Sequence, residues 1–165
     1  MTINPVLAIP DNSPDILALR DDLACYQGEL GFPQWHIGEE SLPQLAAQIN
    51  ADEWFVVWSH REIVATVRII YDDPELWPQG GNAGYIHGLM VRRDRMGQGL
   101  GSAMLAWAES DIRASDRSLA RLDCAMTSLN LRRYYQNRGY LEVGEVHPST
   151  GSPYEPAILL EKSII

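Results

Sequence analysis

Three glycines at alternate positions mark a segment that could bind a phosphate group. Residues 91–101 read Val-Arg-Arg-Asp-Arg-Met-Gly-Gln-Gly-Leu-Gly, and a helical pattern follows directly. Gly97, Gly99 and Gly101 allow a tight turn in which several backbone N–H groups point at one place. The amino end of the following helix brings partial positive charge to the same place. The segment is therefore suited to a pyrophosphate.

Two well-known phosphate-binding loops do not fit this segment. A Walker A loop ends in Gly-Lys-Ser/Thr, whereas Gly101 is followed by Ser102 and Ala103. The single lysine of the chain is Lys162, far from the loop. A dinucleotide fingerprint needs G-x-G-x-x-G near the first strand, but these glycines are spaced G-x-G-x-G and lie in mid-chain. A glycine-rich helix start that binds no ligand remains an alternative.

The loop and a second segment together resemble the GNAT acetyltransferase superfamily. Residues 91–101 are similar to the acetyl-CoA loop of that family, R/Q-x-x-G-x-G/A, which lies between a strand and a helix. Residues 131–140, Leu-Arg-Arg-Tyr-Tyr-Gln-Asn-Arg-Gly-Tyr, resemble its helix that ends in Tyr-x-x-x-Gly-Phe. The segments occur in the family's order. The resemblance implies an enzyme that moves an acetyl group from acetyl-CoA to an amine.

The resemblance assigns acetyl-CoA to a strand end, the glycine loop and a later turn. Backbone groups of residues 89–91 would bind the pantetheine amides and the thioester oxygen. In the later turn, Ser128 replaces a frequent Asn of the family, and Asn130 lies two positions further on. The expected cofactor-binding residues are Leu89, Met90, Val91, Arg92, Met96, Gly97, Gln98, Gly99, Leu100, Gly101, Ser102 and Asn130.

One position of the loop departs from the family pattern. Met96 stands where the family usually has Arg or Gln, a side chain that often helps to hold the pyrophosphate. Guanidinium groups match phosphate oxygens well. We therefore expect Arg92, Arg93 or Arg95 to replace the missing contact.

The chemistry needs an acid and a base. The resemblance makes Tyr135 the general acid, and a phenol with a pKa near 10 is protonated at neutral pH, as an acid must be; helix packing beside Tyr134 is its alternative role. The strand at residues 85–91 contains no carboxylate, so His87 is our candidate base and Asp123 the second candidate. A histidine hydrogen-bonded within the sheet and an arginine-paired aspartate are the structural alternatives.

Four aromatic or histidine side chains are candidates for the acceptor site. Trp35 and His36 lie in the loop that usually lines this site in the family, and Trp77 lies on a second acidic loop. Tyr85 shares a strand face with His87, because strand side chains alternate. Peripheral packing is the alternative role for the two tryptophans and His36.

Charge is divided unevenly along the chain. The net charge of −9 argues against nucleic acid or an anionic membrane as partner. Residues 92–138 carry nine Arg and five Asp or Glu, whereas residues 1–91 carry three Arg and thirteen Asp or Glu. The acidic part suits a small cationic acceptor such as a polyamine or amino sugar, or a protein amino group. A merely solvated acidic surface is the alternative.

Composition indicates one globular domain over residues 1–165, because 165 residues with 45% hydrophobic content can bury a sizeable core. No apolar run approaches the roughly 20 residues of a membrane span, and no secretory signal is visible. Cys25 and Cys124 make no disulfide framework, which favours a cytoplasmic protein. We expect no metal, and a homodimer is compatible with the family.

The pattern of apolar residues and turns predicts an α+β fold. We expect a single GNAT-like domain with a central, mostly antiparallel, twisted sheet of six to seven strands and helices on both faces. The expected strands are 6–9, 54–58, 63–71, 85–91, 119–125, 140–146 and 157–161, and the expected helices start near Ser13, Ser41, Leu100 and Asn130.

Two other functions fit the same motifs. A catalytically degenerate module would bind or sense acyl-CoA without turnover, as the changed loop and turn residues would allow. A protein N-acetyltransferase would act on an N-terminus or a lysine of a partner. It should have an open acceptor groove, whereas an enzyme for small molecules should have a closed pocket.

Overall fold

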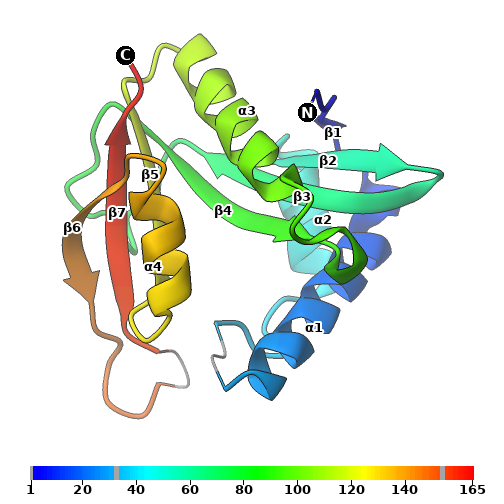
Figure 1. Cartoon of the computed structure of the whole chain (residues 1–165), viewed down its shortest axis with the longest axis horizontal. Coiled ribbons are helices and arrows are strands. Elements are labelled where there is room, and N and C mark those ends of the chain that lie inside the picture. The colour runs from blue at the N-terminus through cyan, green and yellow to red at the C-terminus, as the bar shows by residue number, and fades with distance from the viewer. Residues whose placement is uncertain (1, 32–33, 153–154) are drawn as a thin grey trace.

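Seven strands form one sheet in the computed structural model, which describes residues 2–31, 34–152 and 155–165 (Figure 1). The strand order is β1-β2-β3-β4-β5-β7-β6, and all neighbours are antiparallel except β4 and β5. The predicted mixed, mostly antiparallel sheet is thereby confirmed. The strands are β1 (Val6–Leu7), β2 (Trp54–Ser59), β3 (Glu62–Ile70), β4 (Ala83–Val91), β5 (Leu119–Ala125), β6 (Leu141–Val146) and β7 (Ala157–Ser163).

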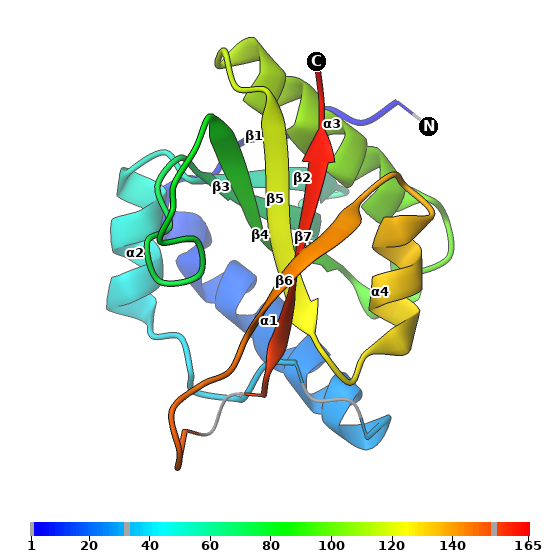
Figure 2. The same ribbon diagram turned by 90° about the vertical axis from the view of Figure 1, so that its left-hand side faces the viewer.

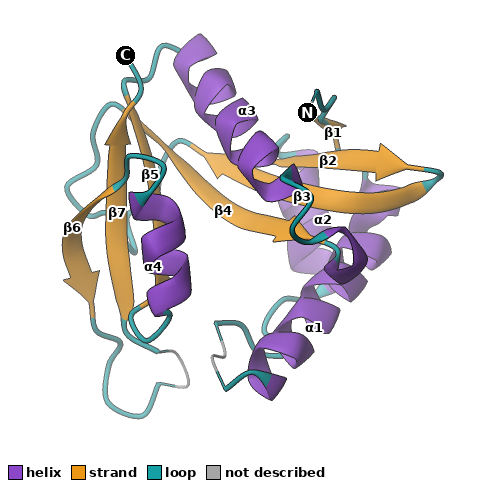
Figure 3. Cartoon of the chain, viewed as in Figure 1, coloured by secondary structure: helices purple, strands orange, loops and turns teal. Residues whose placement is uncertain are grey.

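Helices cover both faces of the sheet, as predicted (Figure 3). On one face, α1 (Ser13–Glu29) and α2 (Leu42–Asn50) enclose a core with β2 and β3. On the other face, α3 (Leu100–Ala114) and α4 (Leu129–Gln136) pack on β3, β4, β5 and β7. Short 3-10 turns precede α1 and α3, at Pro10–Asn12 and Arg93–Arg95. Among the described residues, no helix is long and apolar enough to cross a membrane.

Side-chain hydrogen bonds at Ser41 fix the start of α2, where the sequence predicts it. The hydroxyl of Ser41 accepts the N–H of Gln44, and the Gln44 side chain accepts the N–H of Ser41 in return. This capping box satisfies two backbone donors that the helix itself leaves free. Helix α2 therefore begins directly after Ser41.

Strands β4 and β5 pair over only three residues each. Ala83–Tyr85 lies beside Leu119–Arg121, and beyond this point β4 continues to Val91 and β5 to Ala125 without mutual pairing. Figure 1 shows the two strands meeting at one end and diverging toward the other, and Figure 2 shows β5 beside β7, its partner on the other side. The divergence leaves one edge of β4 without a neighbouring strand.

A β-bulge at Gly88 accompanies this divergence. Thr66 pairs with Met90 and Arg68 with His87, so Gly88 and Leu89 together face the single residue between Thr66 and Arg68. Such a bulge bends the strand and increases its twist. Gly88 has a φ of +53°, and its carbonyl accepts the Thr66 hydroxyl at 2.8 Å.

The bulge needs glycine for space as well as for conformation. An added Cβ at Gly88 would lie 2.5 Å from Cη2 of Trp54, whose side chain is 4% exposed. We expect Gly88→Ala to lower the free energy of unfolding by about 3 kcal/mol, because left-handed strain adds to overpacking. Urea denaturation would measure this change.

Gly31 provides the matched control, because its φ is +75° but no atom lies within 4 Å of an added Cβ. Gly31→Ala should cost only the conformational part, about 1 kcal/mol. Equal losses at the two positions would show that the contact with Trp54 is unimportant.

Candidate active site

Two cavities meet in the gap between β4 and β5. Both are lined by Gln27, Trp35, Leu89, Leu131 and Tyr135. The first, here called the loop cavity, has a volume of 530 Å³, and the second, the acidic cavity, has a volume of 520 Å³. The loop cavity is further lined by Leu23, Met90, Val91, Arg95, Met96, Gly97, Gly99, Leu100, Gly101, Ser102, Tyr134 and Arg138.

The glycine loop presents free backbone donors to the loop cavity. Gly97 and Gly99 have φ values of +75° and +82°, which glycine adopts readily. Helix α3 starts after Gly99 without a side-chain cap, and its first bond from the N-terminal turn joins the Ala103 N–H to the Gly99 carbonyl. Among the described residues, no group accepts from the N–H groups of residues 97–102. The loop can therefore donate to an anion.

The open edge of β4 adds donors and acceptors beside the loop. The N–H of Arg92 donates to the Val64 carbonyl of β3 at 2.9 Å. Because backbone groups alternate in direction along a strand, those of Val91 and Leu89 point away from β3 and into the gap. Met90, also predicted as a cofactor contact, lines the loop cavity, although its backbone groups face β3 and its residue is largely buried.

Of the three arginines expected to replace the missing loop contact, only Arg95 lines the loop cavity. Arg92 lines neither cavity, and its guanidinium is paired with Glu62 and Asp94. Arg93 lies over the ring of Tyr26, 4.4 Å from its centroid. These arginines are engaged by neighbouring side chains instead.

Sequence reasoning missed Arg138, which lies in the turn directly after α4 and lines the loop cavity. Its guanidinium lies 3.5 Å from the centroid of the Tyr134 ring and donates to the Ser102 hydroxyl. Tyr134 lies in the last turn of α4 and Arg138 two residues after its end, and this spacing of four was the available signal.

Two further predicted cofactor residues lie outside the cavities. The Gln98 side chain donates to the Asp94 carbonyl at 3.1 Å and so braces the loop. Asn130, in the first turn of α4, is exposed to solvent and lines neither cavity. Met96 does line the loop cavity, with 42% of its surface exposed.

Tyr135 forms the boundary between the two cavities. Its side chain is 8% exposed and packs edge-on against Tyr134 and Tyr140, with centroid distances of 5.2 and 5.8 Å. Burial raises the pKa of the Tyr135 phenol, and a nearby Cys124 adds to the effect. The phenol is therefore protonated at neutral pH and is able to donate a proton.

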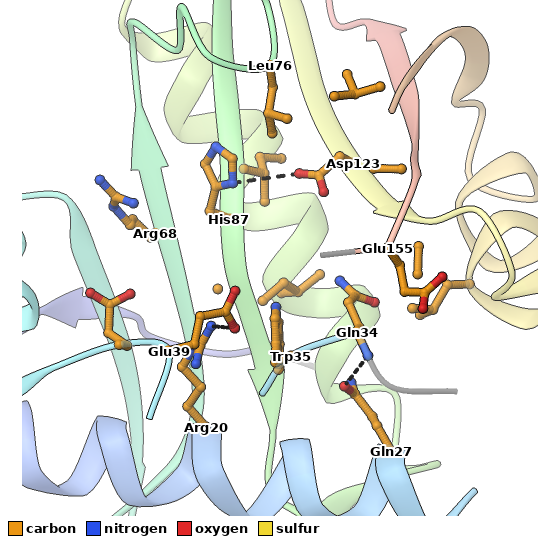
Figure 4. A pocket seen from close by; sticks show the side chains of 18 of the residues that line it. Arg20, Gln27, Gln34, Trp35, Glu39, Arg68, Leu76, His87, Asp123 and Glu155 are labelled. Atoms are coloured by element: carbon orange, nitrogen blue, oxygen red, sulfur yellow. Dashed lines mark hydrogen bonds and ion pairs between the residues drawn. The ribbon is translucent and has the colours of Figure 1, made fainter. Parts of the chain in front are cut away.

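His87 lies between two carboxylates, at the wall of the acidic cavity. Its Nε2 is 3.1 Å from Oδ2 of Asp73. Its Nδ1 is 3.8 Å from Oδ1 of Asp123, the contact drawn in Figure 4. Burial acts to raise the pKa of Asp73, but contacts with His87, the N–H of Leu76 and the charge of Arg68 together leave the pKa lowered. Burial raises the pKa of Asp123; His87 opposes this shift and Asp73 adds to it.

The acidic cavity carries an excess of carboxylates. Its two arginines are balanced, because Arg20 pairs with Glu39 and Arg68 with Glu53, each at 2.7 Å. Figure 4 shows His87 and Asp123 side by side, with Trp35 and Glu39 on the opposite side of the cavity. Its other lining residues are Gln34, Glu40, Trp54, Glu75, Leu76, Ile86, Gly88, Ala125, Val146, Pro148, Glu155 and Ala157.

Three residues expected at the acceptor site do not line it. Trp77 is 5% exposed and Tyr85 1% exposed, and the two rings pack 6.1 Å apart. Arg121 lies 4.6 Å from the Trp77 ring centroid and covers it. His36 is exposed and lines neither cavity. Tyr85 is buried in the part of the sheet where β4 and β5 still pair, and Trp77, on the loop before β4, packs against it.

Comparison with known proteins agrees with this geometry. A family model described as Acetyltransferase (GNAT) family matches residues 18–140. The Bacillus subtilis (strain 168) protein "Uncharacterized N-acetyltransferase YesJ" is 29% identical over 145 residues, covering 83% of this chain and 81% of that protein.

Solved structures show the same fold. A GNAT-family acetyltransferase from Listeria monocytogenes 4b F2365 has a TM-score of 0.78 at 20% identity, with 98% of this chain and 94% of that chain covered. The PaiA N-acetyltransferase from Thermoplasma acidophilum, solved with coenzyme A, has a TM-score of 0.73 at 13% identity, with 99% of each chain covered.

The family model spans most of the chain, and its span includes the glycine loop, the open edge of β4 and the buried tyrosine of α4. The chain therefore belongs to the GNAT acetyltransferase family and is an acetyl-CoA-dependent N-acetyltransferase.

Proposed function

We propose that the acceptor is a small cationic amine, which binds in the acidic cavity and attacks the acetyl group directly in a ternary complex. The observation that carries this proposal is the excess of carboxylates in a cavity that meets the loop cavity at Tyr135. Among the described residues, no side chain pairs with Glu75 or Glu155, and both arginines of the cavity are already paired. A cation would complete this charge balance.

The residues of the loop cavity fit coenzyme A. The free N–H groups of residues 97–102 and the guanidinium groups of Arg95 and Arg138 would hold the pyrophosphate. The edge groups of Leu89 and Val91 would hydrogen-bond the pantetheine arm as a neighbouring strand would. When bound, acetyl-CoA supplies an acetyl group activated as a thioester.

His87 and Asp123 prepare the acceptor nitrogen. An ammonium group has no free electron pair, so it must lose a proton before it can attack. The Asp123 carboxylate holds the ammonium, and His87 accepts the proton through a ring nitrogen. Both side chains line the acidic cavity.

Tyr135 acts at the other end of the reaction. One C–N bond forms and one C–S bond breaks, and the departing thiolate takes the proton of the Tyr135 hydroxyl. The acceptor nitrogen gives up two protons in all: one restores Tyr135 and the other leaves through His87 to solvent. A backbone N–H at the open edge of β4 stabilises the negative charge on the carbonyl oxygen.

A thiol-release assay with a panel of amines tests the proposed acceptor class. Turnover should be highest with a diamine or triamine, lower with an amino sugar, and lowest with a neutral arylalkylamine. Preference for a lysine-containing peptide would favour a protein acceptor instead. Tight binding of acetyl-CoA with no turnover on any amine would favour the acyl-CoA-binding module.

Removing the Tyr135 hydroxyl should slow the reaction without weakening cofactor binding. We expect Tyr135→Phe to lower kcat by about 100-fold, as for loss of a general acid, with the KM for acetyl-CoA nearly unchanged. Tyr140→Phe is the matched control, because its hydroxyl is also buried but Tyr140 lines neither cavity. Similar kcat values for both variants would exclude Tyr135 as the acid.

The buried carboxylate of Asp123 should lower the stability of the protein at neutral pH, although we propose that it binds the acceptor. Its folded-state pKa is raised, so the folded protein binds this proton more tightly than the unfolded chain does. The resulting stabilisation is present below the ordinary pKa of 3.8 and is lost as the pH rises through the raised value. At neutral pH, Asp123→Asn should therefore melt at a higher temperature than the wild type.

Melting temperatures of both proteins over a series of pH values test the direction of this effect. The advantage of Asp123→Asn should shrink as the pH falls toward 3.8, while at neutral pH its KM for a cationic amine should rise at least several-fold. A variant that is less stable than the wild type at neutral pH would contradict the assigned cost of the buried carboxylate.

A further inference from the structure

His87 is also held by a carboxylate that lines neither cavity. Asp73 lies on the loop between β3 and β4 and is 8% exposed. Its Oδ2 is 3.1 Å from Nε2 of His87, and its Oδ1 accepts the N–H of Leu76 at 3.5 Å. The carboxylate is thus fixed by its own loop and faces one ring nitrogen of His87.

This contact selects one form of the ring. An ionised carboxylate only accepts hydrogen bonds, so the ring nitrogen that faces it must carry the proton. The ordinary pKa of an aspartate is 3.8 and that of Asp73 is not raised above it, so its carboxylate is ionised at neutral pH. In a neutral imidazole with the proton on Nε2, Nδ1 carries the free electron pair.

The free electron pair of Nδ1 then points toward a second acceptor. Nδ1 and Oδ1 of Asp123 are 3.8 Å apart, which is longer than a hydrogen bond. Two hydrogen-bond acceptors cannot bond to each other, so both need a donor from elsewhere. An ammonium group has three N–H donors and can donate one to each of them.

We propose that Asp73 is a positioning residue that keeps the proton of His87 on Nε2, so that Nδ1 and the Asp123 carboxylate together bind the acceptor ammonium. This proposal rests on the proposed function and deepens it, because it names the atoms that recognise the reacting nitrogen. One proton passes from the ammonium nitrogen to Nδ1, and the nitrogen keeps the electron pair with which it attacks.

The proposal makes the acceptor's reacting group a primary ammonium rather than a hydroxyl or a thiol. A neutral hydroxyl has only one donor and cannot bridge both acceptors. A charged ammonium also compensates the carboxylate of Asp123, whose raised pKa reflects its burial and the neighbouring Asp73. The pair therefore favours a cation over a neutral molecule.

The tautomer of His87 can be measured directly. Long-range ¹H–¹⁵N correlation spectra of the wild-type protein distinguish a ring protonated on Nε2 from one protonated on Nδ1 or on both. The chain has four histidines, and the signals that vanish in His87→Gln belong to His87. We expect the wild-type ring to carry its proton on Nε2 at neutral pH.

Asp73→Asn should reverse this arrangement. The amide of Asn can donate to Nε2, which moves the ring proton to Nδ1 and removes the electron pair that faces the ammonium. We expect the NMR signature to change and kcat to fall by about 100-fold. The KM for acetyl-CoA should not change, because Asp73 does not line the loop cavity.

Asp72→Asn is the matched control. Asp72 precedes Asp73 in the same loop and is exposed, so its variant removes the same charge without touching His87. It should leave both the tautomer and the rate as in the wild type.

Three results would overturn the proposal: a wild-type His87 protonated on Nδ1 or on both nitrogens, an unchanged tautomer in Asp73→Asn, or an unchanged rate in that variant. The wild-type spectrum needs no substitution, so it decides the tautomer even if Asp73→Asn does not fold. If no amine in the panel is acetylated, the proposed function fails, whereas the spectra still test the role of Asp73.

Discussion

The separation of β4 from β5 is the constraint on which the rest of the site depends. A sheet normally satisfies every backbone group of its inner strands, but here two central neighbours pair over only three residues each. The bulge at Gly88 bends β4 at the point where this pairing has stopped. The unpaired edge of β4 lies in the middle of the sheet rather than at its border, where a ligand and not another strand can complete it.

This gap also joins two regions of different charge. On one side, the glycine loop offers free N–H groups and two guanidinium groups, and on the other side most charged groups are carboxylates. An anionic cofactor and a cationic acceptor would therefore approach from regions that attract each of them. Tyr135 lies at the boundary, and its burial keeps the phenol protonated where both ligands would meet.

Local rules were sufficient for the elements and the loop. The fifth strand was predicted with the boundaries that the structure shows, Leu119–Ala125, and Ser41 caps α2 as expected. The glycine pattern also located the loop cavity, because glycine spacing and the start of a helix are both local properties of the chain. These features depend on residues that are close in sequence.

The site side chains were harder to predict, because their positions depend on contacts between distant segments. Strict alternation placed Tyr85, His87 and Leu89 on one face, but the bulge between His87 and Leu89 ends that alternation. Trp77 belongs to an acidic loop in the sequence, yet Arg121 from β5 covers its ring.

The same limit applies to the charged residues. Arg92 is adjacent to the loop in sequence but is paired with Glu62 from β3, whereas Arg138 reaches the loop cavity from a segment more than thirty residues away. Asp73 could be assigned only once the fold had placed its loop beside β4. Sequence proximity to the loop was therefore a poor guide to the side chains that line it.

Asp73, His87 and Asp123 show why such a cluster is not a product of stability alone. The imidazole of His87 lies within 4 Å of both carboxylates. The raised pKa of Asp123 means that the fold disfavours its charged form. A neutral side chain at this position would avoid that cost. Because Asp123 and His87 line the acidic cavity, a bound cation would supply the missing compensation, and the proposed acceptor would gain in binding the energy that the fold loses here.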